Sequence, residues 1–337
     1  MPSWARRTAS APGRVTLLGE HTDYNEGLSL GVATPQRTVA TAEADHSGVV
    51  IVDSSDLGVG SCAIDRADGP SFAVLAAALA RQAGLGGARV EVTSDLPVGV
   101  GMSSSAAYAV AIAIALGVEG DPITLATACQ AAERDAGSDV GLLDQLVVLA
   151  ASPGRVVDID FRGPTVTALA MPASIGLSVV DTGAPRTLVT TAYAQRRAEC
   201  ASAAARIGAP LGSASMREVE TIDDGLLRRR ARHVVSECAR VREARTALAL
   251  GDLGAFGALL DEGHASLRDD FDVSTPRVES TRDEVVRVGG VTGARLCGAG
   301  FGGCLIVAHD PDIVLSVAGH WTSRIEPGGG ASLSSTS

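Results

Sequence analysis

DLPVGVGMSSSA, residues 95–106, is a glycine- and serine-rich stretch between a short β-branched run and a long apolar run. Residues 88–93 before it predict a strand, and the Ala-rich residues 104–116 after it predict a helix. Glycines at 99 and 101 allow the backbone to approach an anion closely, while the N–H groups and dipole of a helix start attract phosphate. The order of strand, loop and helix therefore predicts a phosphate-binding loop. An ordinary helix N-cap with a flexible lead-in is the alternative.

Composition limits the class of protein. A chain of 337 residues is longer than one hydrophobic core usually serves, so we expect two domains. Apolar residues make up 46% and aromatic residues 3%, which requires a core of Ala, Val and Leu and favours helices packed on sheets. A net charge of −11 argues against a nucleic-acid partner, because phosphate backbones are bound by positive surfaces.

All 28 basic residues are arginine, and the chain contains no lysine. A P-loop needs its lysine to reach the β- and γ-phosphates, and a protein kinase needs a strand lysine for the α- and β-phosphates. A lysine Schiff base is excluded for the same reason. Any phosphate chemistry here must depend on other groups.

The spacing of the cysteines and the sequence near the chain ends indicate a cellular compartment. The six cysteines form no CxxC pair and several lie in apolar segments, so we expect buried free thiols in a reducing compartment. No uninterrupted apolar stretch is long enough for a membrane span, and the N-terminus has no apolar segment typical of a signal peptide. We therefore expect a cytoplasmic protein without membrane contact. The small, polar ending EPGGGASLSSTS predicts a disordered tail.

The remaining pattern predicts strands and helices along the whole chain. The first 70 residues show short apolar runs and turns typical of strands. Two prolines at 164 and 172 bracket a plausible domain boundary. Helices are predicted at 71–83, 124–135, 141–151, 191–207, 226–250 and 253–267, and further strands at 155–160, at 175–181 and on both sides of residues 298–303.

GAGFGG, residues 298–303, formally satisfies the GxGxxG pattern. The apolar strand CLIVAH follows it, whereas a dinucleotide-binding fingerprint requires a helix at that point. We therefore set aside a dinucleotide-dependent oxidoreductase as a minor rival. A tight strand-to-strand turn and a functional loop remain equally open.

GRVTLLGEHTDY, residues 13–24, places ionisable side chains directly after a short apolar strand. Glu20, His21, Thr22 and Asp23 could bond several sugar hydroxyls at once, because carboxylates accept hydrogen bonds and imidazole can donate or accept. A solvated turn is the alternative. A metal site is disfavoured, because the segment lacks the i, i+4 spacing of HExxH.

GRVTLLGEHTDYNEG, LPVGVGMSSSAA and GARLCGAGFGGC resemble the three sequence motifs of the GHMP kinases, and the first resembles the galactokinase signature. Further matches are CQAAE (129–133), GLLDQ (141–145), TAYAQRRAEC (191–200), RRRARHVVSE (228–237) and SLRDDFDVSTP (266–276). The resemblance implies a two-domain α+β fold with the active site in the interdomain cleft. A ribosomal-protein-S5-like domain would span residues 1–170, a ferredoxin-like domain residues 171–326, and the tail residues 327–337.

The resemblance also implies a role for each matching position. Asp144 would be the catalytic carboxylate, which takes or orients the proton of the acceptor hydroxyl, and Arg14 would pair with it and stabilise the developing charge. Ser105 and Glu133 would hold Mg²⁺. The ATP phosphates would be bound by Gly99, Gly101, Ser103, Ser104 and Ser105. The sugar would be bound by Glu20, His21, Asp23, Gly141, Asp144 and Tyr193. The loop with Gly298, Gly300 and Gly302 would close over the site.

The implied activity is transfer of phosphate from ATP, with Mg²⁺, to the anomeric hydroxyl of an aldose such as galactose. The loop RDAGSDV (134–140) is shorter than the family pattern, and Ser29-Leu-Gly31 also departs from it. A heptose, an octose or a modified hexose is therefore an alternative acceptor. A non-catalytic sensor of sugar and ATP is a second alternative, which the intact Arg14 and Asp144 disfavour. We expect a monomer or a weak homodimer.

Overall fold

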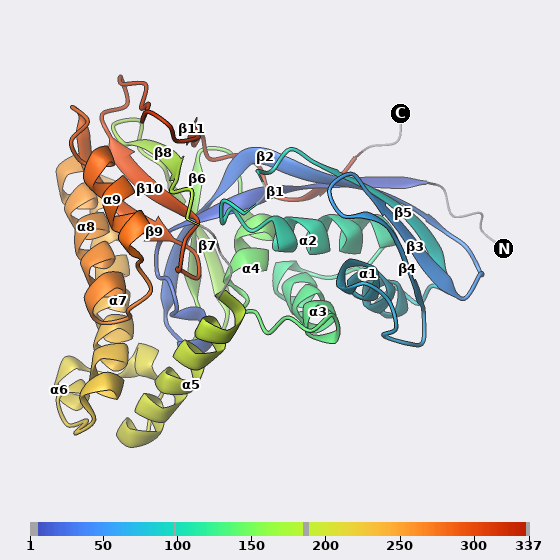
Figure 1. Cartoon of the computed structure of the whole chain (residues 1–337), viewed down its shortest axis with the longest axis horizontal. Helices are drawn as coiled ribbons and strands as arrows, with labels where there is room; N and C mark the ends of the chain where they lie inside the picture. Colours follow the sequence, from blue (N-terminus) through green and yellow to red (C-terminus); the bar gives the residue numbers. More distant parts are fainter. Residues whose placement is uncertain (1–5, 98, 185–188, 335–337) are drawn as a thin grey trace.

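The computed structural model of the protein describes residues 6–97, 99–184 and 189–334 (Figure 1). Two sheets organise these residues, and the two sets of elements lie at opposite ends of the molecule in Figure 1. The mixed α+β class predicted from the sequence is confirmed. All six cysteines are buried and free, and no helix of the described ranges is long and apolar enough to cross a membrane.

The first sheet has eight strands and is covered on one face by helices. Six strands follow the order β12-β1-β2-β5-β3-β4, while β6 pairs with β2, and β7 pairs with β6. The strands are β1 (Arg7–Leu18), β2 (Leu28–Ala44), β3 (Val49–Ser54), β4 (Gly58–Ala63), β5 (Ala88–Ser94), β6 (Arg155–Asp160), β7 (Thr165–Ala170) and β12 (Ser332–Leu333). The helices are α1 (Ser71–Gln82), α2 (Ser104–Leu116), α3 (Pro122–Asp135) and α4 (Leu143–Ala150).

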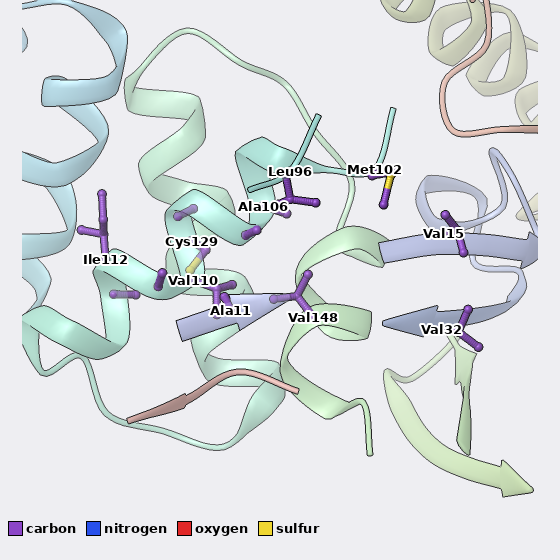
Figure 2. Packing of buried hydrophobic residues seen from close by; sticks show 14 of the residues in the cluster. Ala11, Val15, Val32, Leu96, Met102, Ala106, Val110, Ile112, Cys129 and Val148 are labelled. Carbon is purple, nitrogen blue, oxygen red and sulfur yellow. The ribbon is translucent and has the colours of Figure 1, made fainter. Parts of the chain in front are cut away.

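Helix α2 forms the centre of this layer because most of its side chains are apolar and six of them are alanine. It packs on β1 and β2, and its alanines let the neighbouring helices approach closely. Figure 2 shows Ala11 of β1, Val110 of α2 and Val148 of α4 within the same buried cluster. In the second half of β2, Thr38, Ala40 and Ala42 are buried while the residues between them are less so, as expected for a strand covered on one face.

The second sheet has four antiparallel strands in the order β11-β8-β10-β9. These are β8 (Gly176–Asp181), β9 (Val291–Cys297), β10 (Cys304–His309) and β11 (Thr322–Arg324). Helix α8 (Leu253–Asp269) packs on β9 and β10, and α7 (Gly225–Leu250) packs on α8 (Figure 1). The other helices are α5 (Val189–Ile207), α6 (Met216–Val219) and α9 (Pro276–Val285), and two short 3-10 helices are η1 (Asp23–Asn25) and η2 (Leu211–Ser213).

Most predicted elements are present, with a few differences. Residues 164–172, predicted as a boundary, contain strand β7, and helix α9 was not predicted. The helix predicted from residue 141 begins at Leu143, and Gly141 precedes it, close to the Asp23 side chain. The exact domain boundary at residue 170 stays a prediction. The first sheet's strand β7 ends at Ala170 and the second sheet's strand β8 begins at Gly176.

The prediction of a disordered tail over residues 327–337 is wrong for residues 327–334. Strand β12 pairs with β1, and the backbone N–H groups of Gly330 and Ala331 donate to Ala151 and Val148. A Cβ on Gly330 would lie 2.7 Å from the carbonyl oxygen of Leu149. The small residues that suggested disorder instead let the chain pass close to the end of α4 before β12 pairs with β1. Residues 335–337 lie outside the described residues.

Candidate active site

A cavity of about 260 Å³ lies where the three quoted motifs meet. One wall is the glycine- and serine-rich loop before α2, and another is the segment between β1 and η1. The segment before α4, Tyr193 of α5 and the first residues of the GAGFGG loop complete it. Of the predicted site residues, the lining includes Arg14, Glu20, His21, Asp23, Gly99, Gly101, Ser103, Ser104, Ser105, Gly141, Asp144, Tyr193 and Gly298.

The loop before α2 has an unusual backbone. Ser103 has φ of 54° and Gly101 has φ of 91°, both in the left-handed region. Ser103 stands at the N-cap position of α2 but makes no side-chain capping bond. Its hydroxyl donates instead to Asp144 Oδ2. The ordinary N-cap alternative therefore does not describe this loop, because a capping serine would bond the helix it starts.

Arg14 joins this loop to Asp144. Its Nε donates to Asp144 Oδ1 at 2.7 Å, and its Nη1 donates to the carbonyl of Gly101 at 3.0 Å. Its backbone N–H also donates to the carbonyl of Met102. Burial lowers the pKa of Arg14, but Asp144, Cys297 and Glu20 together raise it by more, and the net pKa lies above the ordinary value. A permanent positive charge therefore stands between the loop and the carboxylate.

Glu20 and His21 contribute buried polar atoms to the opposite wall. Glu20 Oε1 accepts from the backbone N–H of Gly298 at 2.6 Å, and His21 Nδ1 pairs with the Tyr24 hydroxyl at 2.8 Å. Glu20 Oε2 and His21 Nε2 have no hydrogen-bond partner among the described residues, although Arg295 Nη2 lies 3.9 Å from Glu20 Oε2. Burial raises the pKa of Glu20 and lowers the pKa of His21. Buried polar atoms usually have partners, so these two suit a ligand that carries hydroxyl groups.

Asp23 lies beside Gly141 at the same end of the cavity. A Cβ on Gly141 would overlap Asp23 Oδ2, so any other residue there would displace the Asp23 side chain. Burial, reinforced by the negative charge of Asp144, raises the pKa of Asp23 to about 6. Near neutral pH, Asp23 is therefore a carboxylate that a small change of surroundings can protonate.

Arg197 of α5 ties two parts of this wall together. Its Nη1 lies 2.9 Å from Asp139 Oδ1, and its guanidinium lies 5.1 Å from the centre of the Tyr24 ring. Tyr24 bonds His21, and Asp139 lines the cavity. The sequence motif TAYAQRRAEC contained Arg197, four residues after Tyr193 on the same helical face, and this spacing could have identified it.

Glu133 and Ser105 lie together beside the loop. Burial raises the pKa of Glu133, and hydrogen bonds with Gln145 and Ser105 lower it. Burial has the larger effect, and the net pKa is about 7. The described residues contain no cluster of three or more His, Cys, Asp or Glu that could hold a metal alone. One carboxylate and one hydroxyl nevertheless fit Mg²⁺, which usually keeps waters and takes its remaining ligands from substrate phosphates.

The GAGFGG loop between β9 and β10 lies against the loop before α2. A Cβ on Gly303 would lie 3.1 Å from the carbonyl oxygen of Val100, and one on Gly298 would lie 3.7 Å from that of Gly101. Gly300, with φ of 85°, packs against Val273, and Gly302 packs against Ala184. Of the two alternatives left open by the sequence, contact with the cavity favours a functional loop.

A second cavity of about 280 Å³ shares Ser104, Ser105 and Ser138 with the first. Glu133 lines it, together with apolar side chains from α1 and Tyr108 of α2. The sequence pattern gave no signal for this cavity, because its walls come from separate elements of the first sheet and its helices.

Comparisons with known proteins agree with this geometry. Three family profiles match: "Galactokinase galactose-binding signature" over residues 3–44, "GHMP kinases N terminal domain" over 71–151 and "GHMP kinases C terminal" over 244–324. A galactokinase of Mycobacterium tuberculosis H37Ra is 39% identical, covering 91% of this chain and 90% of the relative. A galactokinase of Roseiflexus sp. RS-1 is 38% identical, covering 88% of this chain and 81% of the relative.

A solved structure supports the same assignment. The crystal structure of Lactococcus lactis galactokinase complexed with galactose superposes with a TM-score of 0.88 and 26% identity. The alignment covers 98% of this chain and 95% of that chain. The Methanococcus jannaschii mevalonate kinase, at 15% identity and a TM-score of 0.69, shares the fold. The chain belongs to the galactokinase family of the GHMP kinases and is an ATP-dependent sugar kinase.

Proposed function

We propose that the chain transfers the γ-phosphate of ATP to the anomeric hydroxyl of galactose. The position of Asp144 carries this proposal. Its two carboxylate oxygens bond Arg14 and Ser103, and Ser103 belongs to the loop that precedes α2. Phosphates on this loop and a sugar against Glu20, His21 and Asp23 would meet beside Asp144.

Each end of the cavity suits one substrate. The glycines and serines at 99, 101 and 103–105 offer N–H and hydroxyl donors to the triphosphate, helped by the N-terminal end of α2. Glu20, His21, Asp23 and Tyr193 offer acceptors and donors to sugar hydroxyls, with Gly141 leaving room for Asp23. The two sets of residues would therefore hold the phosphate donor and its acceptor side by side.

Asp144 and Arg14 would carry the chemical step. Phosphoryl transfer depends mainly on positioning and on neutralising charge. Asp144 would accept or orient the proton of the anomeric hydroxyl as its oxygen attacks phosphorus. Arg14, held charged and buried between Asp144 and the loop, would stabilise the charge that develops on the transferred group.

We further propose that Ser105 and Glu133 hold Mg²⁺ with the nucleotide phosphates. When bound, the ion supplies positive charge that neutralises the phosphate oxygens. Glu133 is buried, and its Oε2 accepts from Gln145 Nε2, which fixes its direction. The GAGFGG loop would close the site from the second sheet, since Gly298 already bonds Glu20.

A coupled assay of ADP release with MgATP across a panel of aldoses tests this function. The panel includes galactose, galactosamine and heptoses. We expect the highest kcat/KM with galactose and turnover in the usual enzymatic range of about 1 to 10³ s⁻¹. Turnover with only a heptose would reassign the acceptor. Sugar and ATP binding without phosphotransfer would make the chain a sensor.

A further inference from the structure

Arg295 of β9 is a fully buried arginine that the proposed function leaves without a role. It belongs to the motif GARLCGAGFGGC and precedes the first glycine of the loop, Gly298, by three residues. Burying a charge is unfavourable unless the charge is paired and hydrogen-bonded. The groups that surround this guanidinium therefore indicate what it does.

One side of the guanidinium is paired with Glu237 of α7. Arg295 Nη1 lies 2.6 Å from Glu237 Oε1, which also accepts from the backbone N–H of Gly19. Burial raises the pKa of Glu237, but Arg295 and Arg240 lower it by more, so Glu237 is a carboxylate. This pair connects β9 and α7 to the residue that follows β1.

The other side of the guanidinium faces Glu20. Arg295 Nη2 has no hydrogen-bond partner among the described residues, and neither has Glu20 Oε2, which lies 3.9 Å away. Pairing with Glu237 accounts for Nη1 alone. Because buried polar atoms usually have partners, two such atoms facing each other indicate a function for the Glu20 oxygen.

Helix α8 leaves room for the guanidinium. Gly263 lies inside this helix, where glycine is less favourable than alanine. A Cβ on Gly263 would lie 2.8 Å from Arg295 Nη1 and 3.3 Å from its Cζ. The glycine therefore keeps the place of the charged group beside Glu20, against the preference of the helix.

Arg295 can act on the sugar side only through Glu20. Within the described part of the chain, the lining of the first cavity includes Glu20 but not Arg295. The backbone N–H of Gly298 donates to Glu20 Oε1 at 2.6 Å. One oxygen of Glu20 is thus fixed by the loop, and the other remains for a ligand.

The charges around Glu20 oppose one another. Burial raises the pKa of this carboxyl group, and Cys297 of β9 raises it further. Arg295 lowers it, followed by the loop N–H group and by Arg14 of β1. His233 of α7 bonds the backbone carbonyl of Glu20, and burial lowers the pKa of His233 to about 4, so it adds no charge at neutral pH. Arg295 is therefore the main positive charge that favours the carboxylate form of Glu20.

We propose that Arg295 is a positioning residue for sugar recognition, which keeps Glu20 as a carboxylate whose Oε2 accepts from a sugar hydroxyl. This role rests on the proposed function, because Glu20 belongs to the sugar side of the cavity. One motif then holds both oxygens of Glu20. Gly298 binds Oε1, and Arg295 faces Oε2.

Arg295→Met tests this role, because it removes the charge and keeps a long unbranched side chain. We expect the KM for galactose to rise about three- to tenfold, as for a weakened hydrogen bond, with the KM for MgATP unchanged. Loss of the positive charge also raises the pKa of Glu20, so the carboxylate is lost at a higher pH.

Arg295→Lys provides the comparison, because it keeps the positive charge. As pH falls, the decline of kcat/KM for galactose should begin about one pH unit higher in Arg295→Met than in Arg295→Lys. Asp23 is the same in both variants, so the difference reports on the charge at position 295. Identical pH profiles of the two variants would overturn the proposal.

Arg240→Met is the matched control. Arg240 also pairs with Glu237, at 2.8 Å, but on its other carboxylate oxygen. Both variants therefore remove a buried guanidinium from the same partner, and both should lower the melting temperature. Only Arg295→Met should raise the KM for galactose. An equal rise in both variants would make Arg295 a structural support and contradict a positioning role.

The double variant Arg295→Met/Glu237→Gln replaces Arg295→Met if the single variant does not fold. It removes both members of the pair, which usually costs less stability than removing one. The amide oxygen of Glu237→Gln can still accept from the Gly19 N–H. The same rise in the KM for galactose is expected, and an unchanged KM would contradict the proposal.

Calorimetry with galactose alone separates this inference from the proposed function. If galactose binds but is not phosphorylated, the proposed function fails, while the affinity for galactose still reports on Arg295. A three- to tenfold weaker affinity in Arg295→Met than in Arg240→Met would then support the positioning role. Equal affinities in these two variants would contradict it.

Discussion

The two glycine-rich loops that border the cavity lead into different secondary structure. The loop at 95–103 follows β5 and enters helix α2, whereas the loop at 298–303 joins two paired strands, β9 and β10. The first therefore presents a helix N-terminus and serine hydroxyls to the cavity, and the second presents backbone that covers it. The two loops are alike in glycine content, so their roles are distinguished by the element that follows each loop, a helix in the first case and a strand in the second.

The comparison predicts unequal consequences for the two loops. Changes at the junction of the first loop with Asp144 should affect the chemical step, because Ser103 and Arg14 both bond this carboxylate. Changes in the second loop should affect sugar binding more than the chemical step. The loop contacts the cavity through the backbone N–H of Gly298, which donates to Glu20 on the sugar side.

Asp144→Asn should have the largest effect. We expect kcat to fall roughly 10²-fold or more while ATP binding stays near normal, because general-base and electrostatic contributions are each of about this size. Steady-state kinetics and ADP calorimetry on the same preparation measure both quantities. Unchanged turnover would show that Asp144 takes no part in the chemical step. The contact of the first loop with Asp144 would then give that loop no larger role in the chemistry than the second loop has.

Gly300→Ala tests the covering loop. The new Cβ would lie 2.5 Å from Val273 Cβ, at a residue with φ of 85°. We expect kcat/KM for the sugar to fall about tenfold, mainly through KM, because a misplaced loop weakens the Gly298 contact with Glu20. Gly289→Ala, where a Cβ meets nothing within 4 Å, is the matched control and should leave the kinetics unchanged. A drop mainly in kcat would show that the second loop also serves the chemistry.

Asp23→Asn should change the pH dependence of sugar use. Burial raises the pKa of Asp23 to about 6, so the carboxylate that accepts from sugar hydroxyls is lost as pH falls through about 6. We expect kcat/KM for the sugar to decline below pH 6 in the original protein. In Asp23→Asn this decline should disappear, with a lower plateau. If kcat/KM of Asp23→Asn still declined below pH 6, the decline would come from the titration of another group.

The same substitution should raise stability at neutral pH. The folded-state pKa of Asp23 lies above its ordinary value of 3.8, so the folded state binds more protons between these values. Asp23 therefore destabilises the fold as pH rises from about 4 to 6, and its neutral replacement avoids this cost. Thermal melts at pH 5 and pH 7.5 should show the larger gain at pH 7.5. A gain only at low pH would contradict the assignment.

Arg197→Met should have the smallest effect. It breaks the contact that holds Asp139 to α5 and leaves Tyr24 less fixed behind His21. We expect a roughly threefold rise in the KM for sugar and no change in the KM for ATP. Arg134→Met is the control, because Arg134 lies farther from Asp139, at 3.8 Å, and is exposed. Equal effects of the two variants would contradict a positioning role for Arg197.

Sequence patterns predicted the elements that depend on local signals. The order of strand, loop and helix around residues 95–106 and the Ala-rich helix α2 were correctly predicted, because glycine, serine and alanine act over a few residues. The tail at 327–334 was mispredicted, since its order comes from pairing with β1, far away in the sequence. Composition cannot report such long-range contacts.

The candidate site shows the same limit. Glu20 and His21 stood out as ionisable residues directly after an apolar strand, and the resemblance to the GHMP kinases pointed to Arg14 and Asp144. The second cavity gave no such signal, because α1, α2 and the loop after β5 reach it from separate parts of the chain. The bond from Ser103 to Asp144 was also missed, because it requires the left-handed backbone at Ser103.

Phosphorus NMR of the reaction products tests the central claim most directly. The protein is incubated with MgATP and either galactose or 1-deoxygalactose, which lacks the anomeric hydroxyl. The account predicts ADP and a sugar 1-phosphate with galactose, and neither product above background with 1-deoxygalactose. Equal ADP formation with both sugars, or ADP and free phosphate without any sugar phosphate, would contradict it.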